Sequence, residues 1–84
     1  MTLQLQPVRV ATGSEDGDGQ LVFAGGFLVA VLVRLSDQHG ADVGLWFLEA
    51  GFGVTSVARA PLFLDLDAAQ DWIERHLGTK RVSV

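Results

Sequence analysis

The segment 21–35, LVFAGGFLVAVLVRL, constrains the fold of this chain most strongly, because nearly every residue up to Val33 is apolar. Only Gly25-Gly26 interrupts the apolar run, and glycine supplies the positive φ that a two-residue hairpin turn requires. The β-branched residues that follow favour a strand over a buried helix. We therefore predict a β-hairpin with strands over 20–24 and 27–35.

The strand over 27–35 is unusual because both of its faces are apolar. One face carries Phe27, Val29, Val31, Val33 and Leu35, and the other carries Leu28, Ala30, Leu32 and Arg34. A strand with one solvated face normally alternates apolar and polar residues. The sequence therefore predicts that both sides of this strand need cover.

Further strands are predicted on either side of this hairpin. Period-2 alternation indicates a strand over 3–12, and Pro7, which has no N–H to donate, makes it an edge strand. A fourth strand over 43–50 again carries apolar residues on both faces. The segment 54–64 fits either an irregular loop or a fifth strand. The tail over 79–84 either extends along the sheet or stays loose.

The helix over 66–77 has the clearest boundary signals in the chain. Asp65 is suited to the N-cap, and Gly78 to the position just after the helix. Apolar residues recur at helical spacing along one side of the segment. We predict an α+β fold in one domain over 1–84: an antiparallel β-meander of four or five strands with one C-terminal helix packed on one face.

Composition and charge argue against several classes of protein. The 84-residue chain is 49% hydrophobic and carries a formal charge of −4, which disfavours nucleic-acid binding because phosphate contacts need clustered Lys and Arg. It has no cysteine, and small secreted domains usually need disulfides, so a cytoplasmic location is predicted. The apolar run is too short to span a membrane, and MTLQLQPVR lacks the features of a signal peptide. We expect a soluble protein.

No catalytic or metal-binding motif emerges from the sequence. The Asp- and Gly-rich loop 13–19 resembles part of a calcium loop, but Gly25 stands where the bidentate Glu should be. His39, between Asp37 and Asp42, lacks the third and fourth ligands that a metal site needs. No Gly-x-Ser-x-Gly elbow is present. We therefore predict no catalytic residue, no cofactor and no metal, and a protein that is not an enzyme.

One helix can cover only about half of one face of a four-stranded sheet, since it is roughly 10 Å across and the sheet is about 19 Å wide. Large apolar patches are uncommon on monomers, so we expect the uncovered face to bind a second copy or another protein. The residues assigned to this interaction surface are Leu28, Ala30, Leu32, Trp46, Leu48 and Phe52.

Two other functions stay open. In the first, a small-ligand-binding or enzymatic domain would use the open sheet surface near Trp46, Phe52 and His39. In the second, the chain would be an acidic inhibitor of a nucleic-acid enzyme, although its ten carboxylates are spread over loops and helix. The leading prediction is a non-enzymatic interaction or dimerisation module.

Two stretches also carry a resemblance to known proteins. The segment 62–78, LFLDLDAAQDWIERHLG, resembles the closing strand and helix of small bacterial proteins built from an antiparallel sheet plus one helix. The preceding LVAVLVRLSDQHGADVGLWFLEAGFG is similar to small uncharacterised proteins of alphaproteobacteria. The resemblance implies the fold and a bacterial origin, and it brings no activity with it.

Overall fold

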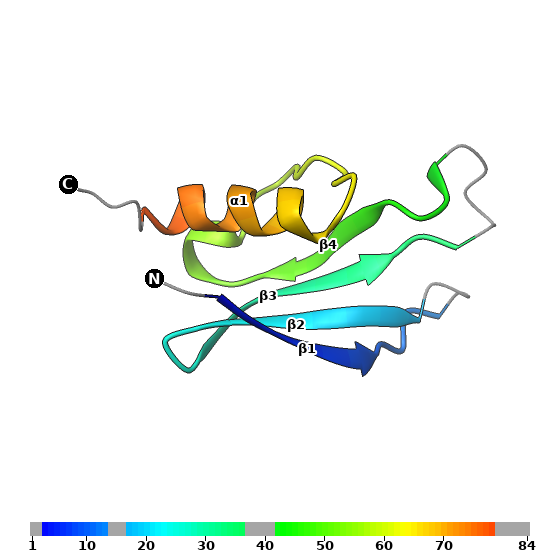
Figure 1. Ribbon diagram of the computed structural model, residues 1–84, viewed down its shortest axis with the longest axis horizontal. Coiled ribbons are helices and arrows are strands. Elements are labelled where there is room, and N and C mark those ends of the chain that lie inside the picture. The colour runs from blue at the N-terminus through cyan, green and yellow to red at the C-terminus, as the bar shows by residue number, and fades with distance from the viewer. Residues whose placement is uncertain (1–2, 14–16, 37–41, 79–84) are drawn as a thin grey trace.

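The computed structural model describes residues 3–13, 17–36 and 42–78, so the tail predicted over 79–84 lies outside the described residues. Its elements follow one another along the chain in a simple order (Figure 1). They are β1 (Leu3–Arg9), β2 (Asp18–Ala24), β3 (Phe27–Arg34), β4 (Trp46–Gly51), the 3₁₀ turn η2 (Gly53–Thr55) and α1 (Leu66–Leu77).

The four strands form one antiparallel sheet in the order β1-β2-β3-β4, which confirms the predicted α+β meander with a C-terminal helix. The hairpin between β2 and β3 turns at Gly25 and Gly26, whose φ angles are 58° and 86°. Both residues therefore need the left-handed conformation that glycine adopts without steric cost.

The bounds of all four strands differ from those expected from the pattern, and β3 ends at Arg34 and not at residue 35. β1 ends at Arg9 and not at residue 12, whereas β2 begins two residues earlier than predicted, at Asp18. β4 covers Trp46–Gly51 in place of 43–50. The open question over 54–64 is decided against a fifth strand: η2 begins this region, and Phe63 forms an isolated bridge to Trp46.

Two β-bulges change which side chains share a face of the sheet. Val22 pairs with Ala30 and Phe23 pairs with Leu28, so Val29 has no partner on β2. A second irregularity lies between β3 and β4, where Glu49 is left without a partner. An extra residue on one strand shifts the alternation beyond it to the other side. Odd-numbered and even-numbered residues of β3 therefore do not separate onto opposite faces along the whole strand.

Helix α1 begins and ends as its sequence predicts. The Oδ1 atom of Asp65 accepts a hydrogen bond of 2.8 Å from the amide of Ala68, which satisfies one of the free N–H groups of the first turn. Gly78 closes the helix with φ 70°, and its amide donates to the carbonyl of Arg75. Among the described residues, no helix combines the length and apolar composition needed to cross a bilayer.

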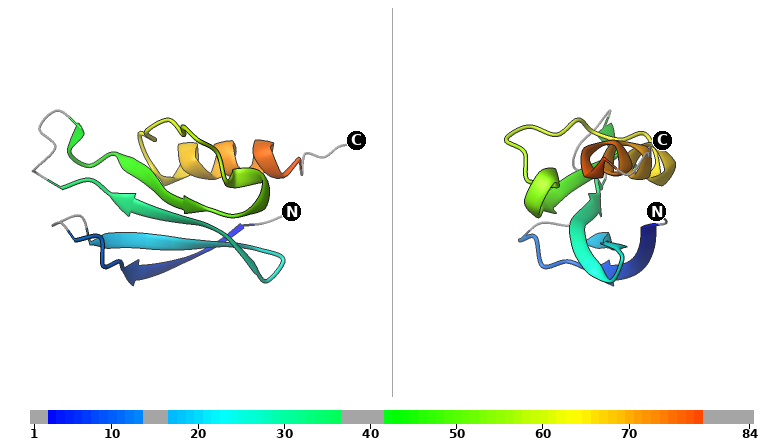
Figure 2. Two further views of the ribbon diagram at one scale, coloured as in Figure 1. Left: turned by 180° about the vertical axis from the view of Figure 1, so that it is seen from behind. Right: turned by 90° about the vertical axis from the view of Figure 1, so that its left-hand side faces the viewer.

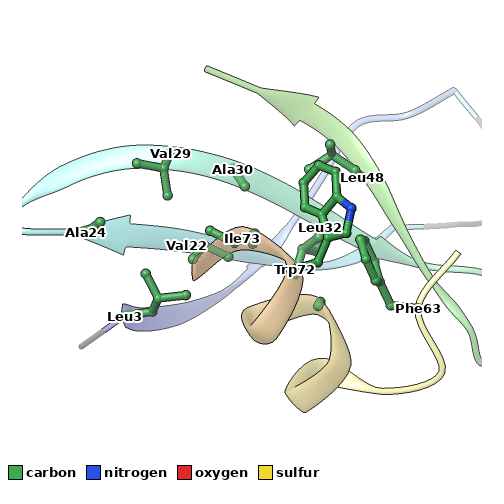
Figure 3. Packing of buried hydrophobic residues seen from close by; sticks show 11 residues of the cluster. Leu3, Val22, Ala24, Val29, Ala30, Leu32, Leu48, Phe63, Trp72 and Ile73 are labelled. Carbon is green, nitrogen blue, oxygen red and sulfur yellow. The ribbon is translucent and has the colours of Figure 1, made fainter. Parts of the chain in front are cut away.

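The core lies between the sheet and α1 (Figure 3). Trp72 and Ile73 of α1 pack there with Leu32 of β3, and the ring of Phe63 meets Trp72 edge-on at 5.6 Å between centroids. The buried cluster consists of Leu3, Val22, Ala24, Val29, Ala30, Leu32, Leu48, Phe63, Ala69, Trp72 and Ile73. Seen end-on, the sheet curves so that the N-terminal end of β1 and α1 lie on the same side (Figure 2).

Candidate interaction surface

The strand register divides the sheet into a side that faces α1 and a side that does not. Leu32 and Leu48 are opposite each other in the core, so the alternating residues Val33 and Phe47 lie on the other side. We call this second side the outer face. Tracing the register across all strands gives its members: Gln4, Gln6, Val8, Gly19, Leu21, Phe23, Leu28, Val31, Val33, Phe47 and Ala50.

The centre of the outer face is apolar and accessible. Leu21 and Val31 are directly paired and half-buried, as is Phe23. Leu28 keeps 36% of its surface exposed and Phe47 keeps 40%. No helix packs on this side of the sheet within the described part of the chain. The outer face therefore exposes contiguous apolar side chains from three neighbouring strands.

One end of the outer face is covered by the chain itself. Val33 is only 1% exposed although α1 lies on the opposite side of the sheet. Gly19 is the partner of Val33 on β2, and the absence of a side chain at Gly19 leaves space for Val10. A Cβ at this glycine would come within 2.7 Å of a methyl group of Val10. Val10 therefore lies over Gly19. The accessible apolar region is confined to the remainder of the face.

The segment after β4 extends this region and is fixed by a buried threonine. Thr55 is fully buried; its hydroxyl donates to the carbonyl of Val29 over 2.5 Å and accepts from the amide of Phe52 over 2.9 Å. Phe52 is extended, so alternation from Ala50 puts its side chain on the outer side, with 47% exposed. The loop thus holds an exposed aromatic ring beside the outer face.

The predicted interaction residues divide between the two sides of the sheet. Ala30, Leu32 and Leu48 are buried in the core against α1, and Trp46 is half-buried beside them. Leu28 and Phe52 are exposed on the outer side. The assignment of the open face was therefore wrong for β3: α1 covers the face with Ala30 and Leu32, not the face with Val31 and Val33.

The residues proposed for a ligand site are not brought together. Trp46 begins β4 and Phe52 follows its last residue, which separates them by about 20 Å along the strand. They also lie on opposite sides of the sheet. His39 and its neighbour Asp37 lie outside the described residues. Over the described ranges, no three His, Asp or Glu side chains cluster as metal ligands would.

Sequence reasoning missed the central residues of the outer face. Alternation puts Val31 on the face opposite the predicted interaction surface, and it leaves Leu21, Phe23 and Phe47 outside that surface. Ala30 and Ala69 are both fully buried in the core between the sheet and α1. The side on which Val29 lies follows from the bulge between β2 and β3, which no local pattern in the sequence indicates.

Comparisons with known proteins identify no relative of this chain. The chain matches no protein-family model, no curated protein and no solved structure. The surface must therefore be interpreted from its own residues.

Proposed function

We propose that this protein is a non-enzymatic interaction module that binds another protein surface through its outer face. The observation that carries the proposal is the continuous apolar surface formed by Leu21, Phe23, Leu28, Val31 and Phe47, with no described element packed on it. Soluble monomers seldom leave such a patch without a use, because burying it is favourable by about 25 cal/mol per Å².

The form of the surface supports a face contact over edge pairing. At one edge, Pro7 removes a backbone donor from β1. At the other edge, the amide and carbonyl of Trp46 already bond to Phe63, at 2.8 and 2.9 Å. Strand addition to either edge is thus weakened, while the outer face stays accessible.

The proposal also includes the cellular location of the module and its bacterial origin. The absence of cysteine supports a cytoplasmic location, and the resemblance to small alphaproteobacterial proteins supports a bacterial origin. A ligand-binding or enzymatic role has weaker support, since the aromatic residues suggested for it diverge along β4.

Site-specific photo-crosslinking in the producing cell tests the proposal. A benzophenone amino acid at Phe47 should give covalent adducts with a protein, whereas the same probe at Arg75, on the exposed side of α1, should give far fewer. Adducts identified by mass spectrometry are then purified and titrated against the wild type and Leu28→Glu. Equal crosslinking from both positions, or unchanged affinity of Leu28→Glu, would reject the outer face as the binding surface.

A further inference from the structure

We draw no further inference here: the strongest candidate, the apolar patch at the centre of the outer face of the sheet around Leu21, Val31 and Phe47, belongs to the surface already described, and nothing in the described residues shows what covers it.

Discussion

At the residue scale, the contact between Gly51 and Thr55 fixes the end of β4. A Cβ at Gly51 would lie only 2.1 Å from the backbone carbonyl oxygen of Thr55. The hydroxyl of Thr55 in turn bonds to Val29 of β3. Glycine at 51 is therefore required by close backbone approach, and this approach closes the loop that presents Phe52.

Substitution of this glycine should be costly. We expect Gly51→Ala to lower the free energy of unfolding by about 1–3 kcal/mol, because the neighbour that must move is backbone and not a flexible side chain. Gly25→Asn is the control: its φ is positive, but open space surrounds it and asparagine tolerates that conformation. Urea unfolding followed by tryptophan fluorescence measures both. An alanine variant as stable as the wild type would contradict the close approach.

The buried hydroxyl allows a sharper test of the same loop. Thr55→Val keeps the shape of the side chain but leaves the Val29 carbonyl and the Phe52 amide without this partner. We expect a loss of about 1–3 kcal/mol in unfolding free energy. Thr55→Ser, which retains the hydroxyl, should lose less than Thr55→Val. If valine were the better tolerated of the two, the hydrogen bonds would not be what holds the loop.

At the element scale, the helix was predictable from local signals whereas the strand faces were not. Asp65 and Gly78 mark the two ends of α1 by capping chemistry that depends only on adjacent residues. The bulge at Val29 depends on how β2 and β3 pair, and it turns Val29 into the core beside Ala30. No local pattern contains that information, so alternation alone misassigned the strand.

The N-cap of α1 supplies a prediction at this scale. Asp65→Ala removes the acceptor for the Ala68 amide, and we expect it to cost about 1 kcal/mol of unfolding free energy. Asp65→Asn preserves an acceptor oxygen at the same position and should be close to the wild type. Thermal unfolding by circular dichroism compares the two variants. A similar loss in both would attribute the effect to charge and not to the capping hydrogen bond.

At the scale of the whole molecule, the sequence predicted a sheet with one apolar face left over, but alternation assigned the wrong face of β3 to it. Both sides of β3 are apolar, so either could have received the helix. In the structure the side of β3 that faces α1 carries Ala30 and Leu32, and Val29 joins them through the bulge. The sequence therefore predicted that an apolar sheet surface would be exposed, and it identified Leu28 and Phe52 as exposed residues. It did not identify the central residues of the surface.

The central claim is that neighbouring residues of β3 have opposite environments, with Leu32 in the core under α1 and Val31 on an accessible outer face. The most direct measurement is the free energy of unfolding in urea for Leu32→Ala and Val31→Ala. We predict a loss of about 2–5 kcal/mol for Leu32→Ala and at most about 1 kcal/mol for Val31→Ala. Equal losses, or a larger loss for Val31→Ala, would contradict the assignment of the two faces and the interaction surface built on it.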